Sequence, residues 1–516
     1  MSRRLIRDPL ILLLLVGSSL AVVKNTKTLS LKDGSVLQVS FSHPTGDAYI
    51  QRISIAPASN VTCNITNVSS ETSFIIAQIH TYQYNVTLSY TEDDLNKVSN
   101  NSVFGSNIGL LIRPGLNIMT QLYLKNDNVH HVDALLVGIP YNDKAPVPGG
   151  CNMEFNTKIA PYAKVVADDT TVVVDVQPAS IPFNNTAQPI CEKNKVELEI
   201  YQMFLSEQDF TIDSYFIGIT NMLTVEDIIQ NGRKISGSQA LTPMRRVFNA
   251  YTGTGSVYAA VAKYGNYSAS YVPGFSYACS PLLYPESCQL LTEIFPRLVC
   301  AGCFFVGLWA VLRGPFLSIP TFFTGTVIGY VIAEASKGSY NPSANIAIAL
   351  TIGITFLLLT MCCSITWPLI NKLLLTFNVG FFFACVAYFC SPDEFLLVHN
   401  SWIFWTLFIL LFVIITFLTA ISFPVSLPAS SAIFSAYMMI LPLDYYFGSA
   451  LKYIIINVIR RMTVKGFEQA VVLPPVQAKD ITFIVMWTLF ALYAFVKYWL
   501  PSKTFGVSEE TPLISE

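Results

Sequence analysis

Two acidic residues, Glu334 and Asp444, lie inside the long apolar second half of the chain. An ionisable group within a membrane segment is a candidate for function by default, because placing it there costs free energy. Facing a water-filled path, such carboxylates could bind a cation or pass a proton, which is the chemistry of a channel or transporter. The simpler interpretation, which we favour, is an interfacial carboxylate paired with Lys452 or Arg460.

Hydrolytic chemistry needs residues that this chain does not bring to its apolar segments. The five histidines are His43, His80, His130, His131 and His399. An intramembrane zinc hydrolase needs several ligands that converge between helices, an aspartyl protease needs a second aspartate facing Asp444, and the Gly-x-Ser-Gly motif of a membrane serine protease is missing. The adjacent His130 and His131 would point to opposite faces of a strand. We therefore predict that the protein is not an enzyme and has no cofactor. Without a basic stripe, it also has no expected nucleic-acid partner.

The segments that would position the two carboxylates are long enough to be membrane helices. The chain is 52% hydrophobic and only 12% charged, and apolar runs of about 18 to 22 residues recur in its second half. We predict spans at 292–312, 316–335, 344–365, 370–390, 402–422, 429–448 and 480–500. A receptor of the rhodopsin type is not indicated, because the Asp-Arg-Tyr and Asn-Pro-x-x-Tyr signatures are missing. A seven-span receptor of another type stays open, as does a channel or transporter.

The first half of the chain carries the signs of a translocated region. Residues 1–21 join three arginines to a short apolar run and a small-x-small site, which predicts a cleaved signal peptide. Seven Asn-x-Ser/Thr sequons precede the first predicted span and none follows it: Asn60, Asn64, Asn67, Asn85, Asn100, Asn184 and Asn266. They predict a glycosylated extracellular or luminal ectodomain.

Five cysteines fall in this region, where an oxidising compartment lets disulfides persist. They are Cys63, Cys151, Cys191, Cys279 and Cys288. An odd number leaves at least one thiol over, and the sequence does not give the connectivity. We predict the bridges Cys151–Cys191 and Cys279–Cys288, with Cys63 free because three sequons crowd it.

The ectodomain is predicted to be all-β. Short runs alternate apolar and polar residues or are rich in β-branched and aromatic residues, with turn residues between them; examples are YNVTLSY, TTVVVDV, VELEIYQMF and SVYAAVAKY. In YNVTLSY the alternation puts Asn85 on the wet face, from which a glycan would project. Such strands predict two stacked sandwiches, residues 22–148 and 149–290, divided near KAPVPGGC (144–151). NMLTVEDIIQNG is the one segment of the ectodomain that could form a helix.

The predicted fold is therefore an N-terminal all-β, sandwich-like ectodomain, a seven-helix transmembrane bundle over residues 291–501 and a cytosolic tail over residues 502–516. With the glycosylated N-terminal region outside or in a lumen, an odd number of spans puts the C-terminus in the cytosol. In the cytosol the closing EETPLI is accessible to sorting adaptors. Glu509 stands four residues before the Leu513–Ile514 pair, a pattern that such adaptors bind. We predict localisation at the plasma membrane, endolysosomal membranes or both.

One loop disagrees with the usual bias of basic residues toward the cytosol. The segment before the last span holds Lys452, Arg460, Arg461, Lys465 and Lys479 on its predicted outer side. From residue 451 to 462 the apolar residues recur at helical spacing, which predicts an amphipathic helix lying flat at the outer membrane boundary. Asp444 and Glu334 would meet Lys452 or Arg460 there.

Small residues recur at every fourth position of the second predicted span: Thr321, Gly325, Gly329 and Ala333. The GxxxG pair formed by Gly325 and Gly329 lets a neighbouring helix approach closely. We favour packing within the bundle over a dimer face.

Several stretches resemble a known family. SFIIAQIHTYQYNVTLSY, APVPGGCNMEF, YVPGFSYACS, LDYYFGSALKYIIINVIRR and the closing TPLI resemble the corresponding stretches of the transmembrane 7 superfamily member 3 family, over nearly the whole chain. The membrane half resembles a domain shared with transmembrane protein 198, and Cys63 departs from the family pattern.

The resemblance implies a non-enzymatic multi-pass membrane protein linked to cell survival and to damping of endoplasmic-reticulum stress. It implies no catalytic residue and no known ligand. The expected partners are membrane lipid, an unidentified extracellular or luminal protein bound by the ectodomain, and a cytosolic sorting adaptor.

Overall fold

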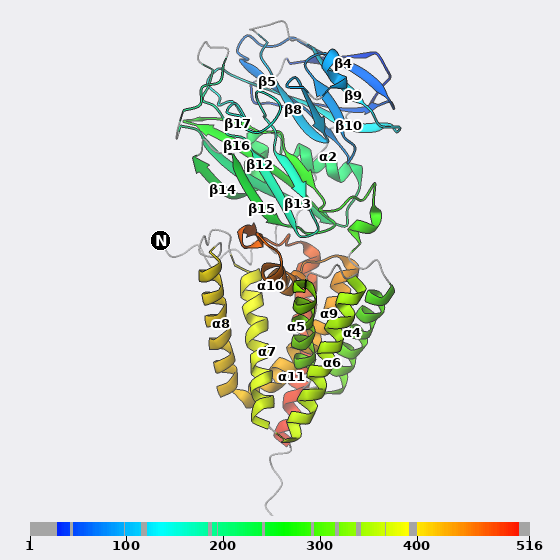
Figure 1. The fold of residues 1–516 in the computed structure, drawn as a ribbon, viewed down its shortest axis with the longest axis vertical. Helices are drawn as coiled ribbons and strands as arrows, with labels where there is room; N and C mark the ends of the chain where they lie inside the picture. Colours follow the sequence, from blue (N-terminus) through cyan, green and yellow to red (C-terminus); the bar gives the residue numbers. More distant parts are fainter. Residues whose placement is uncertain are drawn as a thin grey trace, which may run out of the picture.

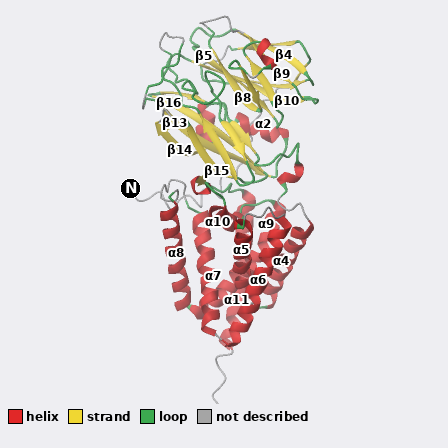
Figure 2. Cartoon of the chain, in the orientation of Figure 1, coloured by secondary structure: helices red, strands yellow, loops and turns green. Residues whose placement is uncertain are grey.

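The computed structural model describes residues 28–41, 45–97, 99–114, 121–183, 188–192, 195–239, 243–289, 294–314, 319–336, 342–366, 368–391 and 400–504. Two β-sandwiches, together called the β head, stand at one end of a bundle of long helices (Figures 1 and 2). The predicted fold class is therefore confirmed. The predicted signal peptide and tail motif (Glu509, Leu513, Ile514), His43, Asn184 and His399 lie outside the described residues.

The N-terminal sandwich consists of two five-stranded sheets with the orders β1-β3-β10-β5-β8 and β2-β4-β9-β6-β7. The strands are β1 Leu29–Leu31, β2 Ser35–Ser40, β3 Tyr49–Ile55, β4 Ser59–Thr66, β5 Phe74–Thr81, β6 Val86–Ser89, β7 Ser102–Gly105, β8 Asn107–Ile112, β9 Gln121–Asn126 and β10 Val132–Tyr141, with a short 3-10 turn η1 at Asp93–Asn96. In β4 buried and half-buried residues alternate strictly, because every second side chain points into the sandwich.

The second sandwich contains strands β11 Lys164–Ala167, β12 Thr171–Val176, β13 Glu197–Glu207, β14 Arg233–Gln239, β15 Met244–Asn249, β16 Thr254–Tyr264, β17 Tyr267–Ser270 and β18 Gly274–Ser276, with η2 Pro285–Cys288 after them. One sheet has the order β14-β13-β16-β17, with β18 beside β16, and the other has the order β11-β12-β15-β19. The fourth strand of the latter, β19 (Ala470–Val471), comes from the C-terminal part of the chain.

Two short helices lie between β13 and β14 in the chain. The helix expected in NMLTVEDIIQNG is α3 (Val225–Asn231), which begins with a capping box between Thr224 and Asp227. A further helix, α2 (Ile212–Thr220), was not predicted; it begins where Thr211 accepts a hydrogen bond from the Ser214 backbone N–H.

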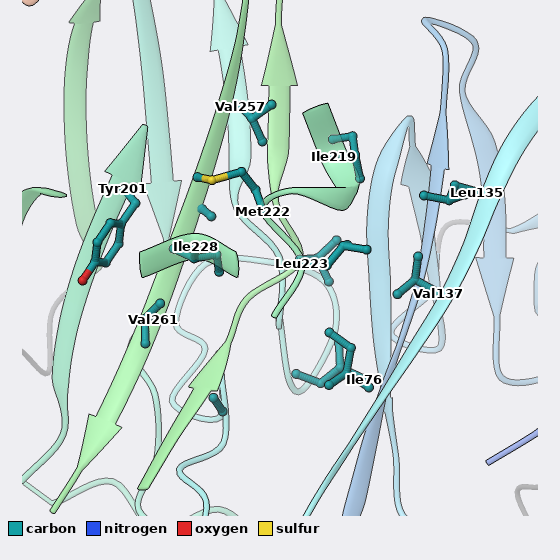
Figure 3. Close-up of a cluster of buried hydrophobic side chains, with 14 of the residues drawn as sticks. Ile76, Leu135, Val137, Tyr201, Ile219, Met222, Leu223, Ile228, Val257 and Val261 are labelled. Carbon is teal, nitrogen blue, oxygen red and sulfur yellow. The ribbon is translucent and has the colours of Figure 1, made fainter. Parts of the chain in front are cut away.

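One hydrophobic cluster joins the two sandwiches, in addition to a separate cluster within each. Leu135 and Val137 of the first sandwich face Ile219 and Leu223 of the second, and all four are buried in one cluster (Figure 3). The chain passes between the sandwiches after β10, and Val147 already pairs with Ser180 of the second sandwich. The predicted division near 144–151 thus separates two units that are packed together.

Among the described residues, seven long helices form the bundle: α4 Ile294–Arg313, α5 Ile319–Ala335, α6 Pro342–Thr366, α7 Pro368–Phe389, α8 Ser401–Ile421, α9 Phe423–Phe447 and α11 Ala478–Thr504. Each predicted span falls on one of them. Within the described residues, five helices are long and apolar enough to cross a membrane, and Leu375–Phe389 is a shorter apolar helix. Helix α5, with 17 residues, is at the lower end of the length that spans a bilayer.

The small-residue stripe of α5 packs against α6 of the same chain. A Cβ added to Gly329 would lie 2.9 Å from the Cα of Ala349, and one added to Gly325 would lie 2.7 Å from the Cβ of Phe356. Only glycine lets the two helices come this close, so the stripe is used inside the bundle.

A short helix, α10 (Tyr453–Thr463), lies between the bundle and the second sandwich and is followed by η4 (Phe467–Gln469) and β19 (Figure 1). The sequence predicts this helix and its place at the head end of the bundle. The prediction that it lies open at the membrane boundary is wrong, because the β head covers it and even Asn457 and Arg461 are buried.

Candidate functional site at the junction of head and bundle

The loop between α9 and α11, residues 448–477, joins the bundle to the second sandwich; we call this region the junction. Its strand β19 pairs in parallel with β15, with Val247 opposite Ala470 and Phe248 opposite Val471. Val471 and Leu473 are buried in the same hydrophobic cluster as Phe248. The membrane part of the chain therefore supplies both a strand and core side chains to the head.

At the centre of the junction one lysine meets two carboxylates. The Nζ of Lys452 lies 3.1 Å from an oxygen of Glu207 on β13 and 3.7 Å from an oxygen of Asp444 on α9. The Lys452 side chain is 0% exposed and that of Glu207 is 5% exposed. Asp444 also accepts backbone N–H bonds from Leu451 (3.1 Å) and Lys452 (2.9 Å). Charges removed from water are tolerated only with this kind of pairing.

A third carboxylate, that of Asp480 in the first turn of α11, closes the other side of the junction. It accepts the backbone N–H groups of Ala450 and Gln477, each at 2.6 Å. The Gln477 side chain in turn accepts the N–H of Glu207 at 3.2 Å and donates to the carbonyl of Leu205 at 2.9 Å. Helices α9 and α11 are thus both tied to β13.

The electrostatics of Lys452 and Glu207 favour a clamp over a reactive group. Burial lowers the pKa of Lys452, but the charges of Asp444 and Glu207 and the neighbouring Tyr453 raise it more, so the net shift is upward. Burial raises the pKa of Glu207, and the positive charge of Lys452 opposes this without cancelling it. A lysine that acts as a nucleophile or base needs a lowered pKa. Lys452 is instead held in its charged form.

A second set of polar contacts fastens α10 to the second sandwich. Arg460 donates from Nη1 to the Oδ1 of Asn249 (2.6 Å) and to the carbonyl of Ala250 (2.7 Å). The side chain of Asn249 donates to the Oδ1 of Asn457 at 2.9 Å. Tyr251 donates its hydroxyl to the carbonyl of Val472 at 3.1 Å. The polar face of the amphipathic helix therefore meets protein.

Arg461 turns the other way, into the bundle. Its guanidinium lies 3.8 Å from the ring centroid of Phe404 on α8, and its Nη1 lies 3.3 Å from the hydroxyl of Tyr388 on α7. A cation over an aromatic face is stabilised by the ring quadrupole, the more so when water is excluded. Helix α10 thus contacts the head with one arginine and the bundle with the next.

The structure does not bring Glu334 to the junction lysine. Glu334 is exposed and accepts a hydrogen bond from Asn345 at 3.0 Å, whereas Asp444 is paired with Lys452 as the sequence suggested. Neither acid lines the cavity between the sandwiches (670 Å³), the one beside β17 (860 Å³) or the one between α5, α6 and α7 (350 Å³). In the described part of the chain, no three His, Cys, Asp or Glu side chains are grouped to hold a metal ion.

Comparison with known proteins follows the same division into three parts. The N-terminal sandwich matches the TM7SF3-like N-terminal immunoglobulin-like domain over residues 42–141, and the second matches the TM7SF3-like second immunoglobulin-like domain over residues 146–282. The bundle matches the TM7S3/TM198-like domain over residues 298–499. This chain is a TM7SF3-like membrane protein.

Relatives of this TM7SF3-like chain include transmembrane 7 superfamily member 3 of Homo sapiens, 24% identical over an alignment of 449 positions that covers 83% of this chain and 77% of that protein. The Rattus norvegicus protein of the same name is 26% identical over an alignment of 461 positions that covers 83% of this chain and 78% of that one. A solved glycoside hydrolase domain of Endo-D from Streptococcus pneumoniae R6 overlaps at 9% identity with a TM-score of 0.13, covering 44% of this chain and 33% of its own. An overlap this weak bears on neither fold nor function.

The remaining predicted site residues of this TM7SF3-like chain lie in the head. Cys151 is joined to Cys191 and Cys279 to Cys288, the pairs that the sequence suggested, and Cys63 is free and buried. Of the sequons, Asn67, Asn85, Asn100 and Asn266 are exposed, and Asn60 and Asn64 are partly exposed on the outer face of β4. All six asparagines have side chains on or near the surface of the head.

Sequence reasoning missed Glu207, Asp480 and β19. Glu207 is the last residue of a strand, and its sequence context is that of an ordinary surface acid. Its lysine partner is 245 positions away. The pair Ala470–Val471 is too short to be recognised as a strand. One signal could have found the contact: the basic residues on the polar side of the 451–462 helix need acidic or polar partners, and the sequence analysis looked for them only in Asp444 and Glu334.

Proposed function

We propose that this multi-pass membrane protein acts in cell survival and in the attenuation of endoplasmic-reticulum stress, as a non-enzymatic protein that works through its glycosylated ectodomain. The family resemblance supplies the process. The junction supplies a physical route by which a state of the ectodomain reaches the membrane helices. An unidentified extracellular or luminal protein is the proposed ligand.

The observation that carries this proposal is the sharing of β19. Because Val471 pairs with Phe248 and is buried beside it, the second sandwich cannot shift without moving the loop between α9 and α11. A ligand changes a conformational equilibrium only through a difference in its affinity for the two states. A ligand that binds one position of the second sandwich more tightly than another would shift that equilibrium, and α9, α10 and α11 would follow the sandwich.

The test uses cells in which the endogenous related protein has been deleted and which express the full chain. After thapsigargin treatment, the wild-type chain is expected to lower an unfolded-protein-response reporter and to raise survival. Val471→Asp, which buries a charge in the β15–β19 contact, is expected to lose this effect at equal membrane abundance. Val476→Asp, at a 61% exposed position of the same loop, is the matched control and should act like wild type.

A wild-type chain that leaves the reporter unchanged would contradict the stress role. Ion flux through proteoliposomes containing the chain, lost in Glu334→Gln or Asp444→Asn, would instead support a channel. Ion flux is not expected, because the Asp444 carboxylate is already paired with Lys452 and with two backbone N–H groups.

We further propose that the protein resides at the plasma membrane or in endolysosomal membranes, with the ectodomain outside or luminal and a cytosolic tail bound by a sorting adaptor. Replacing Leu513 and Ile514 together by alanine should shift protein toward the cell surface, because the adaptor would lose both apolar anchors. Surface biotinylation measures this ratio. An unchanged ratio would remove the adaptor from the proposal.

A further inference from the structure

The groove between the two sandwiches opens beside the β6–β7 edge of the N-terminal sandwich. It has a volume of about 670 Å³ and is lined from both sides, by Asn85, Phe104 and Lys125 of the first sandwich and by Glu154 and Lys164 of the second. A space of this size is typical of ligand sites. The groove therefore has room for a bound group between the two domains.

Asn85 directly precedes β6 and lines the same groove as Phe104 of the neighbouring strand β7. In the antiparallel pair β6–β7, Thr87 is opposite Phe104. Val86 is buried in the core, so the residues on either side of it, Asn85 and Thr87, point to the opposite face. Asn85 is exposed there, whereas Thr87 is only 7% exposed. Phe104 is then diagonal to Asn85, at a separation of roughly 7 to 8 Å for such pairs. An attached sugar at Asn85 would stand beside the phenylalanine ring.

The lining of the groove has the chemistry that a carbohydrate requires. Phe104 is 64% exposed and offers a bare ring to the apolar C–H face of a sugar. Amide and charged side chains that can bond hydroxyl groups line the same groove: Asn96, Lys97, Lys125, Asp127 and Asn156. One exposed phenylalanine needs no explanation by itself, but here the ring, the polar groups and a sequon occupy the same groove.

The backbone at the sequon is held in place, which favours one direction for an attached chain. The side chain of Asn128 donates to the carbonyl oxygen of Asn85 at 2.9 Å. Of the six sequon asparagines that the structure describes, Asn85 alone lines the groove. A covalently attached glycan is present at high effective concentration, so weak contacts are enough to keep it there.

We propose that the N-linked glycan of Asn85 fills this groove, with its first sugar against Phe104, and so ties the two sandwiches together. The inference rests on the glycosylated ectodomain proposed above. It concerns a structural role of one glycan and needs no ligand of the ectodomain, so it can fail while the stress function stands.

Glycopeptide mass spectrometry of the full chain from mammalian cells tests the placement site by site. Asn85 should be occupied and should keep an under-processed, oligomannose glycan, because the groove shields it from processing enzymes. The glycan of Asn266, which is exposed and outside the groove, should be processed further. An unoccupied Asn85, or equal processing at both sites, would overturn the proposal.

Hydrogen–deuterium exchange tests the contact itself. In Asn85→Gln the groove segments 102–108 and 154–165 should exchange several-fold faster than in wild type, whereas Asn266→Gln should leave them unchanged. Phe104→Ser keeps the sequon and should give the same faster exchange together with a more processed Asn85 glycan. Unchanged exchange in Asn85→Gln and in Phe104→Ser would show that the groove is empty or holds another partner, and the proposal would be wrong.

Discussion

The ammonium group of Lys452 and the carboxylate of Glu207 lie 3.1 Å apart although their positions are 245 residues apart in the sequence. One belongs to the loop after α9 and the other to the last residue of β13. With both side chains almost fully buried, the pair is a cross-link between head and bundle that water does not screen.

Lys452→Met should therefore weaken the junction strongly. It leaves Glu207 and Asp444 buried without a counter-charge, a loss of about 3 to 5 kcal/mol for buried pairs. Limited proteolysis of the 448–477 loop in the detergent-purified chain should show faster cleavage. The matched control is Lys234→Met. Lys234 is 52% exposed, and its partner Glu199 keeps a second lysine, Lys263, at 2.5 Å, so the change should cost about 0 to 1 kcal/mol. Equal effects of the two variants would contradict the clamp.

The pairing also makes a double-variant prediction. Lys452→Met combined with Glu207→Met should recover part of the lost protease resistance, because two apolar side chains then replace a broken ion pair. Recovery is expected to be incomplete, since Asp444 keeps its buried charge. A double variant as sensitive as the sum of the two single variants would show that the residues do not interact.

The close approach of α5 and α6 depends on Gly329. Gly329→Ala would place a Cβ 2.9 Å from the backbone of Ala349, which should cost about 1 to 3 kcal/mol as overpacking. Gly302→Ala on α4, where nothing lies within 4 Å, makes the same chemical change without a clash. Thermal stability by size-exclusion chromatography should fall only for Gly329→Ala. A lower stability of Gly302→Ala alone would reject this packing.

The N-terminal sandwich should lose stability in mildly acidic conditions because of His80. Burial lowers the pKa of His80 from 6.5 to about 4, so the folded chain prefers the neutral ring. The stabilisation is complete above pH 6.5 and is lost as the pH falls from 6.5 toward 4, by up to about 3 kcal/mol of unfolding free energy. His80→Gln should flatten this slope, whereas His130→Gln, at an exposed position, should keep it.

Cys63 provides the measurement for that prediction. Its thiol is buried in the core of the same sandwich, and burial raises its pKa to about 12. It therefore reacts only when the sandwich opens. Labelling by a pyridyl disulfide reagent at several denaturant concentrations, resolved by mass spectrometry, gives the unfolding free energy at each pH. A slope that is the same in His80→Gln and wild type would exclude the histidine as its cause.

Two adjacent positions of α10 report which side of the membrane the junction faces. Met462 is 44% exposed and Arg461 is buried. Met462→Cys should react with an impermeant thiol reagent in intact cells, and Arg461→Cys should react much more slowly. Labelling of Met462→Cys that appears only after permeabilisation would place the junction, and with it the head, on the cytosolic side.

The local parts of the fold could be predicted from the sequence. The amphipathic period of α10 depends only on nearby residues, and apolar runs alone locate the seven helices. The alternation in YNVTLSY correctly leaves Asn85 exposed just before β6, but Thr87 and Ser89, on the same expected wet face, are buried. The tertiary partners could not be predicted, because Glu207 and Val471 acquire their roles only through contacts more than two hundred positions away. The same limit explains why α10 was expected at a lipid surface. Its apolar stripe is identified correctly, but the sequence does not say whether lipid or the bundle covers that stripe, as the bundle does here, nor whether water or protein meets the polar side.

The strand β19 sets an order in which parts of the protein can fold during synthesis. When β15 emerges from the ribosome its neighbour does not yet exist, and at roughly 5 to 20 residues per second the intervening stretch of about 220 residues takes on the order of 10 to 45 s to synthesise. During that time the edge of the second sandwich at Val247 and Phe248 is unpaired. An unpaired strand edge is prone to aggregation and can be bound by a chaperone. Six helices must be inserted before the missing strand arrives. A truncated head released without its C-terminal loop would remain permanently at this unfinished stage.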